Sequence, residues 1–426
     1  MVRFFRRIRS AGRGAARLLP LGAGFVAALL LANPAALAGH GKNNGHEETF
    51  GLIDTLAVPA PSNNSSCAST GSASTGLASF DISFDDAGLG LYLLADRTHC
   101  SVDIWNSSTD ALVAQIPSFA GIPTSCTPPH AVFDCAGPNG VLTVVKPGDV
   151  KQAWAGDDPS EVKVYDISTP SSPTFVTTIN TGGAFRADEM AYDPKDNVVV
   201  VANDAENLPP GGPGPFLTFI EASSPYTVLG HLYFNGVTNP LATNGLEQTQ
   251  WSPRTGLFYT SVPEVNGVLD SGFIAVIDPT TMTIINGYPT GCEPAGLAVG
   301  PEKFALVGCS DKAVEQMNLA SGHIMRTFPK TGDVDEVWFN QGDSHYFTGG
   351  YDLTVSPPTR ALGVIDAQTR GFDENVPDYG AADHSVAADS ENNHVFVPST
   401  ANTTASSCTS GCIEVFAANK KETGRE

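Results

Sequence analysis

One hairpin pattern recurs along most of this 426-residue chain and constrains its fold more than any other feature. The clearest copy, FIAVIDPTTMTIINGYPTG, runs from Phe273 to Gly291 as an alternating strand, a polar turn and a second alternating strand. This order is the signature of a β-hairpin. Weaker copies begin at Ser101, Val162, Val314 and Leu362. A unit that recurs every ~40–60 residues indicates sheets stacked around an axis.

Aligning these units divides the chain into seven segments, each expected to form one blade of a ring. The segments begin near Leu77, Asn139, Arg186, Leu246, Glu293, Asp335 and Asp383. The last segment is one strand short, and Phe50 to Val58 (FGLIDTLAV) stands alone before the first. We therefore predict an all-β, seven-bladed β-propeller. In it the N-terminal segment is the outer strand of the last blade and closes the ring, so that no sheet edge stays open.

Two of the hairpins, VIDPTTMTIINGYPTG and VIDAQTRGFDENVP, resemble the YVTN repeat of seven-bladed propellers, a group that includes lactonase-like and quinoprotein-like proteins. RADEMAYDPKDN, DEVWFNQGD and HSVAADSENNHVFVP resemble a set of exported bacterial propellers. The resemblance implies the same fold for most of the chain. In that set we expect a His where Glu293 stands here, so no role is carried over to this position.

The N-terminus has the three parts of a signal peptide. Six arginines from Arg3 to Arg17 precede an apolar run, Leu18 to Leu31, and Ala36-Leu37-Ala38 supplies a small-x-small cleavage site. The apolar run is too short and too interrupted to predict a membrane span. We expect a signal peptide (1–38), a flexible leader (39–48), the propeller (49–418) and a charged tail (419–426). The protein is then secreted or periplasmic, by a route that the sequence leaves open.

The chain is strongly acidic. Removing residues 1–38 takes away six arginines and no acid, so 17 basic side chains would face 45 acidic ones, a net charge of about −28. This charge excludes a nucleic-acid partner and an anionic membrane surface as the default. It favours a cation or a basic ligand, although an acidic surface that only keeps an exported protein soluble explains the same number.

All eight cysteines follow the signal peptide, an even number suited to an oxidising compartment. We predict four short-range disulfides: Cys67–Cys100, Cys126–Cys135, Cys292–Cys309 and Cys408–Cys412. For the third pair there is a geometric reason. Two apolar strands flank the turn Gly300 to Lys303, and the two cysteines are expected to face each other across the antiparallel ladder.

Polar residues are expected to converge at one rim of the ring, because every first strand begins there and every second strand ends there. Aligning four blades puts one set at an equivalent position: Asp188, Glu247, Asp335 and His384. Glu189 and Glu336 lie next to this set, and Arg186 and Glu293 lie two positions earlier. The second strands add Asp96, Asp157, Asp204, Asp311 and Asp352.

Charges on the innermost strand are costly unless they are paired, hydrated or coordinating. Asp188, Glu247, Asp335 and His384 are therefore candidate ligands for a divalent cation: Ca²⁺ or Mg²⁺ for the oxygens, with His384 also admitting Mn²⁺ or Zn²⁺. The same four are candidate catalytic residues for opening a lactone or for elimination across a uronic-acid ring. Arg186, Glu189, Glu293 and Glu336 would contact the ligand, although Arg186 is better explained as an internal ion pair with Asp188.

Three hypotheses stay open at this stage. The polar ring is structural, it binds without catalysis, or it is an active site. The leading hypothesis is an exported, monomeric propeller that binds a small molecule, a carbohydrate, a cation or a protein at the acidic rim. The alternative is a metal-assisted lactonase or polysaccharide lyase. The four tryptophans, Trp105, Trp154, Trp251 and Trp338, are expected to pack between blades.

Overall fold

A computed structural model describes residues 49–419, except 63, 65, 147, 149, 382, 383, 405 and 406. The expected signal peptide (1–38) and leader (39–48), and residues 420–426 of the expected tail, lie outside the described residues. Strands make up almost all the regular structure of the described part, where one short 3₁₀ helix, η1 (Val132–Cys135), is the single helical element. Over this part of the chain, no helix has the length and apolar character needed to cross a membrane.

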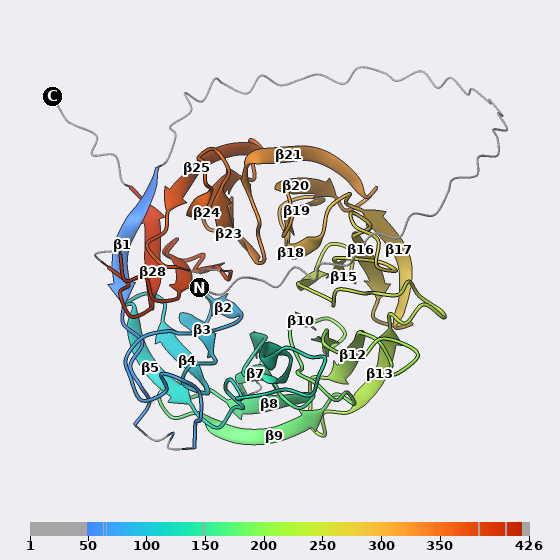
Figure 1. Ribbon diagram of the computed structural model, residues 1–426, viewed down its shortest axis with the longest axis horizontal. Coiled ribbons are helices and arrows are strands. Elements are labelled where there is room, and N and C mark those ends of the chain that lie inside the picture. The colour runs from blue at the N-terminus through green and yellow to red at the C-terminus, as the bar shows by residue number, and fades with distance from the viewer. Residues whose placement is uncertain are drawn as a thin grey trace. The chain divides into compact units, whose positions relative to one another are not determined.

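Antiparallel sheets stand side by side around a central axis, as Figure 1 shows. Four of the sheets use four consecutive strands each. Their strands are β2 (Ser83–Asp86), β3 (Leu91–Asp96), β4 (Ser101–Asn106) and β5 (Ala111–Ile116); β6 (Val141–Val144), β7 (Gln152–Asp157), β8 (Glu161–Asp166) and β9 (Thr174–Asn180); β10 (Met190–Asp193), β11 (Val198–Asn203), β12 (Phe216–Glu221) and β13 (Val228–Tyr233); and β14 (Thr249–Ser252), β15 (Leu257–Val262), β16 (Phe273–Asp278) and β17 (Thr283–Pro289).

An eight-stranded sheet follows, built from two groups of four strands. They are β18 (Pro294–Val299), β19 (Phe304–Cys309), β20 (Ala313–Asn318) and β21 (His323–Gly332), then β22 (Val337–Asn340), β23 (His345–Asp352), β24 (Thr359–Asp366) and β25 (Gly371–Pro377). Two residue pairs join the groups, Thr331 with Asp352 and Gly332 with Tyr351. The joint forms because β21 and β23 extend to 10 and 8 residues, and the sequence pattern did not predict it.

The first and last strands of the chain share a sheet. β1 (Phe50–Leu56) pairs antiparallel with β28 (Cys412–Ala418), and β27 (Val395–Ser399) and β26 (Ala387–Ala388) complete the order β1-β28-β27-β26. β1 thus occupies the outer position that the sequence assigned to Phe50–Val58, and it lies next to the red β28 in Figure 1.

Contacts between first strands run around the axis. β2 contacts β6, and the succession continues through β10, β14, β18, β22 and β26, which contacts β2. The core lies between neighbouring sheets rather than at one centre. Leu217 and Phe219 of β12, for example, pack in one cluster with Phe258 of β15. Burial of such apolar faces is the main stabilising term of the fold, which is a β-propeller as the repeat predicted.

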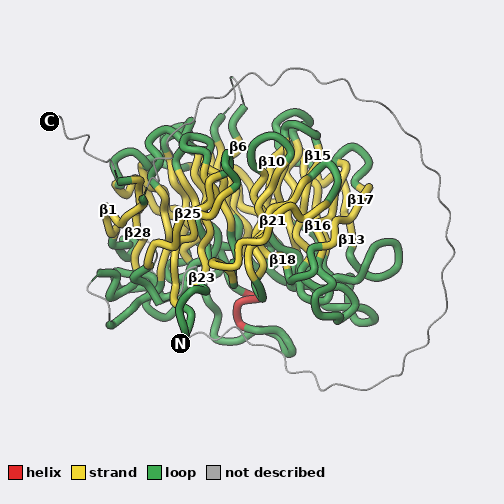
Figure 2. The backbone as a smooth tube through the Cα atoms, turned by 90° about the horizontal axis from the view of Figure 1, so that it is seen from above, coloured by secondary structure: helices red, strands yellow, loops and turns green. Residues whose placement is uncertain are grey.

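Strand direction gives the propeller two unlike ends, seen from the side in Figure 2. At the rim end the first strands begin and the second strands end, and long connections such as 57–82, 117–140 and 234–248 join the sheets. η1, red in Figure 2, marks this end. At the turn end, tight turns such as 253–256 and 300–303 join first to second strands.

All four predicted disulfides are confirmed, with Cα–Cα distances of 5.7, 5.7, 5.9 and 5.1 Å in chain order. All four lie at the rim end. The expected reason for the third was wrong in one respect. Cys309 lies opposite Pro294 instead of Cys292, because the ladder pairs Val299 with Ala305 and is therefore centred after the midpoint of the two cysteines.

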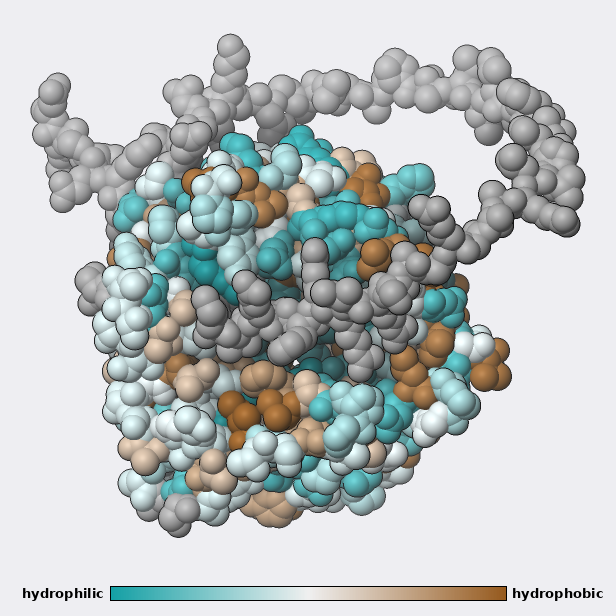
Figure 3. Space-filling view, in the orientation of Figure 1, coloured by the Kyte–Doolittle hydropathy of each residue, from teal (hydrophilic) through white to brown (hydrophobic). Residues whose placement is uncertain are grey.

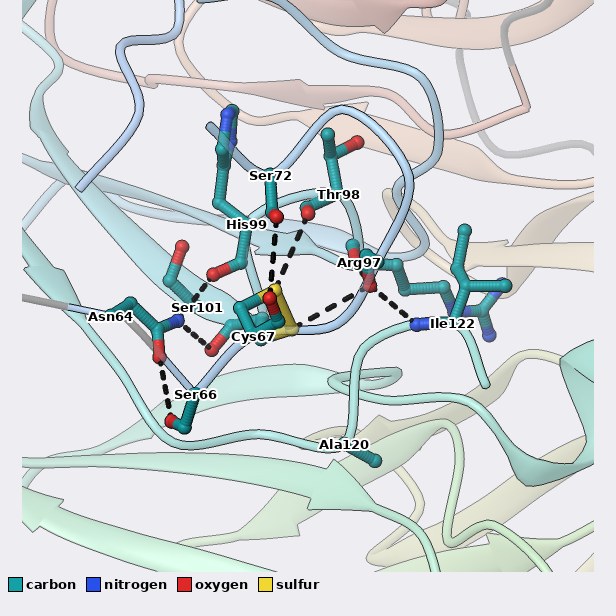
Figure 4. The surroundings of a disulfide bond; sticks show 12 residues. Asn64, Ser66, Cys67, Ser72, Arg97, Thr98, His99, Ser101, Ala120 and Ile122 are labelled. Carbon is teal, nitrogen blue, oxygen red and sulfur yellow. Dashed lines mark hydrogen bonds between the residues drawn. A yellow bond between two sulfur atoms is a disulfide. The ribbon is translucent and has the colours of Figure 1, made fainter. Parts of the chain in front are cut away.

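The first disulfide fastens the connection 57–82 to the end of β3, as Figure 4 shows. The Nδ2 group of Asn64 donates to the carbonyl oxygens of His99 (2.5 Å) and Cys100 (3.3 Å) beside the Cys67–Cys100 bond. The Nε2 atom of His99 lies 2.8 Å from the carbonyl oxygen of Ser74 in the same connection. Side chains and a covalent bond therefore hold in place a segment that has no strand of its own.

Candidate functional site

Charged side chains from several sheets meet where the first strands begin, at the rim end of the axis. We call this set the axial cluster; its members are Asp81, Arg97, Arg186, Asp188, Glu189, Asp204, Glu247, Asp335, Glu336 and His384. It is mostly buried: the side chain of Asp188 is 7% exposed, whereas that of His384 is 21% exposed. In Figure 3 the hydrophilic residues of this face gather mainly in its upper half, and hydrophobic patches lie between them.

Arg186 is the cation around which one half of the cluster is arranged. Its Nε and Nη2 atoms donate to the two carboxylate oxygens of Asp204, at 3.2 and 2.8 Å, and Nη2 also lies 2.8 Å from Oδ2 of Asp188. Its Nη1 donates to the carbonyl oxygen of Phe133 at 3.2 Å. The expected internal ion pair between Arg186 and Asp188 is confirmed. A ligand-binding role for Arg186 stays a prediction.

Arg97 is a second cation, which the sequence analysis missed. It forms an ion pair with Asp81, and its Nε and Nη2 donate to Oδ1 of Asn139 at 3.1 and 2.7 Å. The Nε2 atom of His384 lies 3.5 Å from the other oxygen of Asp81, and its ring stacks on Phe80 with centroids 4.6 Å apart. These contacts join three sheets, because His384 precedes β26, Asp81 precedes β2 and Asn139 precedes β6.

The positions of Asp81 and Asn139 in the sequence would have predicted that both residues lie at the rim. Each stands two residues before its first strand, as do Asp188, Glu247 and Asp335 before β10, β14 and β22. Extending the alignment from four blades to the first two would have found both residues. Arg97 follows β3 directly, as Asp204 follows β11, so the ends of the second strands carried the signal for this residue.

Glu189, Gln248 and Glu336 form a buried network in the same region. The Nε2 group of Gln248 donates to Glu336 at 2.8 Å, and the carboxyl groups of Glu189 and Glu336 share a hydrogen bond. The Oε1 atom of Gln248 accepts from the backbone N–H groups of Leu297 (2.5 Å) and Val337 (3.2 Å). Two carboxyl groups hydrogen-bond to each other only when one of them carries the proton.

Burial and mutual repulsion set the titration of the cluster. Burial raises the pKa of Glu189, with Glu336 and Glu247 adding to it, and burial likewise raises the pKa of Glu336. The pKa of Glu247 is raised by burial and then by Asp335. Asp81 differs: burial alone would raise its pKa, but Arg97 and His384 lower it to about 2. Neutral carboxyl groups therefore stand beside an ionised pair.

The predicted metal ligands are near one another but are not gathered into a coordination site. Among the described residues, the one group of three or more His, Cys, Asp or Glu side chains with ligand atoms within 4.8 Å of each other is Cys292, Cys309 and Glu315, and its cysteines form a disulfide. Metal binding and catalysis by Asp188, Glu247, Asp335 and His384 stay predictions.

The other predicted rim residues mostly hold loops. The backbone N–H of Glu293 donates to Oδ1 of Asp311 at 2.8 Å, and Asp157 pairs with Lys163 at 2.6 Å. Asp96 pairs with His99, and Asp352 accepts from Thr354 and Asn375. Of the five second-strand aspartates, Asp204 is the one that we assign to the axial cluster.

No protein-family model matches this chain, and no curated protein matches it either. In structure the chain is similar to one in the crystal structure of the mitotic checkpoint complex, with a TM-score of 0.57 and 10% sequence identity over 92% of this chain and 99% of that chain. Because 1432 solved chains match the structure, a likeness of this kind identifies the propeller fold and leaves the function open.

Proposed function

We propose that this protein is an exported β-propeller that binds a small, positively charged ligand at the axial cluster. One observation carries the proposal: seven acidic side chains, Asp81, Asp188, Glu189, Asp204, Glu247, Asp335 and Glu336, face two arginines and His384 there. One buried oxygen of the cluster, Oδ1 of Asp188, has no hydrogen-bond partner among the described residues. An unpaired buried acceptor is costly, and a ligand that donates hydrogen bonds would remove that cost.

The proposed propeller has seven blades. Counting the eight-stranded sheet as two groups of four supports this number, and so does the succession of contacts between first strands, which returns from β26 to β2. The pairing of β1 with β28 supports closure of the ring by the N-terminal strand. The resemblance of the hairpins to the YVTN repeat points the same way.

Export is supported by the pattern of residues 1–38 and by four disulfides, which persist in oxidising compartments. The described part of the chain has no helix that could span a membrane, which fits a secreted or periplasmic protein. In this proposal residues 49–418 form the binding domain. A protein that presents a basic side chain to the rim is a second kind of partner, since the similar propeller chain belongs to a protein complex.

Binding of a cation should release protons. The raised pKa values of Glu189, Glu247 and Glu336 keep these groups protonated above the usual range for carboxyl groups. A bound cation favours the ionised forms and lowers those pKa values. The binding enthalpy then depends on the buffer, because the buffer takes up the released protons.

Isothermal titration of the full chain with CaCl₂ and, separately, with putrescine tests the proposal. The titrations are run in PIPES and in Tris, which differ in ionisation enthalpy and do not precipitate calcium. We expect saturable binding of at least one probe with net proton release, lost in a variant carrying Glu247→Gln and Asp335→Asn. Asp278→Asn, at a turn-end position where the side chain accepts from Thr280, is the matched control and should bind normally. Absence of binding by both probes to the folded wild type would overturn the proposal.

A metal-assisted lactonase or lyase is the second candidate. The observation that favours it is the combination of protonated carboxyl groups with an imidazole, since His384 is the main charge that opposes the burial-raised pKa of Asp335. Such a pair suits general acid–base chemistry. Assays with lactones and uronate-containing glycans, on wild type and His384→Ala, test this candidate. Equal background rates would eliminate it without affecting the binding proposal.

A further inference from the structure

The turn end of the same strands holds a cavity of about 350 Å³ that the axial cluster does not reach. Three first strands line it, with Trp251 from β14, Val299 from β18 and Phe339 from β22. The turns that follow add Arg254 and Glu302. Its volume lies at the lower end of the range for small-molecule sites. Trp251 lies three positions after Gln248, and Phe339 lies three positions after Glu336. Each ring is therefore about 10 Å along its strand from the buried polar network at the rim.

Two aromatic rings form rigid walls of this cavity. Trp251 packs against the buried cluster that contains Phe258, and the ring centroid of Phe339 lies 5.0 Å from that of Tyr346. Both rings are half-buried, so part of each stays free to face the cavity. Rings that are already fixed lose little entropy when a flat ligand stacks on them.

The polar groups around these walls favour an anion. The guanidinium of Arg254 is exposed on the turn after β14. The buried Nε1–H group of Trp251 has no acceptor among the described residues, but neither has that of Trp105, which lies outside the cavity, so this donor does not decide the ligand. An anionic group on a ligand would pair with the exposed guanidinium.

We propose that the turn-end cavity binds a small molecule with a flat ring and an anionic group. The ring stacks against Trp251 and Phe339, and the anion faces Arg254, whose planar fork of donors matches a carboxylate or sulfonate. Glu302, on the turn of the next sheet, repels an anion from the opposite side and so fixes the orientation of the ligand. The site is independent of the axial cluster.

Titration of the full chain with 2-naphthalenesulfonate, followed by calorimetry and by quenching of tryptophan fluorescence, tests the proposal. We expect saturable binding that weakens at least about tenfold in Arg254→Glu and in Phe339→Ala. Lys195→Glu is the matched control, because its exposed side chain lies on the equivalent turn of the preceding sheet and does not line the cavity. That variant, and Glu247→Gln in the axial cluster, should change the affinity less than about twofold.

Arg254→Glu reverses a charge on an exposed side chain, so a folded protein is expected and is checked by circular dichroism. Three results would overturn the proposal: no saturable binding to wild type, equal affinity in the two cavity variants and wild type, or tighter binding of 2-naphthylmethylamine than of the sulfonate. The last result would make Glu302 the determinant and the ligand a cation. Loss of calcium or putrescine binding at the rim would leave this site untouched.

Discussion

The two ends of the inner strands carry opposite chemistry although only about 10 Å of strand separates them. On β14, Gln248 just before the strand joins a buried polar network, and Trp251 near its end lines an aromatic cavity. On β22, Glu336 and Phe339 repeat the arrangement. The strands therefore place side chains at both ends of the propeller. The residue types at each end decide whether the site there, the axial cluster or the cavity, is charged or apolar.

The connections differ in the same way. The rim end has the long connections and all four disulfides, whereas turns such as 253–256 close the other end with four residues. Long loops cost more conformational entropy to hold in place, and cross-links reduce that cost. Buried charges also need fixed partners. The rim end thus has long, irregular connections around buried charges, and the disulfides hold these connections in place.

The largest effect is expected from Arg186→Gln at the rim. The substitution leaves the carboxylates of Asp188 and Asp204 without the cation that contacts both, so the free energy of unfolding at pH 7 should fall by about 3–5 kcal/mol. Burial raises the pKa of Asp188 although Arg186 opposes it, so the loss should shrink as the pH falls and this carboxyl gains a proton. Urea unfolding measures it. Arg254→Gln at the turn end is the control, with an expected change within about 0.5 kcal/mol. Equal losses in the two variants would show that the arginines at the two ends contribute equally to stability.

The sequence predicted what alternation and register encode. The two apolar strands expected around the turn Gly300 to Lys303 are β18 and β19, and the alignment of first strands located Asp188, Glu247 and Asp335. Alternation reports the face on which a side chain lies, but it does not name the partner. The bridge from Gln248 to Glu336 spans 88 residues and depends on one side-chain conformation. The role of Arg97 and the β21–β23 joint depend on tertiary contacts in the same way.

The next effect concerns the rim disulfide that closes the β18–β19 hairpin. Cys292 and Cys309 are 17 residues apart in sequence. Replacing both by Ser should lower the free energy of unfolding by roughly 2–4 kcal/mol, because the unfolded chain loses a constraint. Urea unfolding measures the loss, and binding of 2-naphthalenesulfonate at the turn end should survive it. An unchanged free energy would mean that the neighbouring strand pairs hold this end without the bond.

A smaller effect should distinguish the ends by pH. Burial raises the pKa of Glu336, so between its unfolded and folded pKa values the folded protein binds the extra proton. Stability due to this group is present at low pH and is lost as the pH rises. Glu336→Gln should therefore become more stable relative to wild type, by about 1–2 kcal/mol, between pH 5 and pH 8. Glu302→Gln, exposed at the turn end, should leave the slope unchanged; a parallel change in both would refute the assignment.

The last effect tests whether the turn end is free of buried charge. There His345 lies 3.4 Å from Asp343 and 3.2 Å from Asp373, and its ring meets that of Phe50 of β1 edge-on at 5.4 Å. Burial lowers the pKa of His345, but the two aspartates raise it to about 10. The stabilisation is therefore complete below pH ~6.5 and disappears as the pH rises through 10, a window well above that of the rim carboxyl groups. His345→Gln should cost at least about 2 kcal/mol at pH 6 and nothing beyond the lost packing above pH 10. Unfolding at both pH values measures this, with exposed His323→Gln as the control. An equal loss at both values would show that His345 acts by packing alone, and the contrast between a charged rim end and an apolar turn end would then be complete.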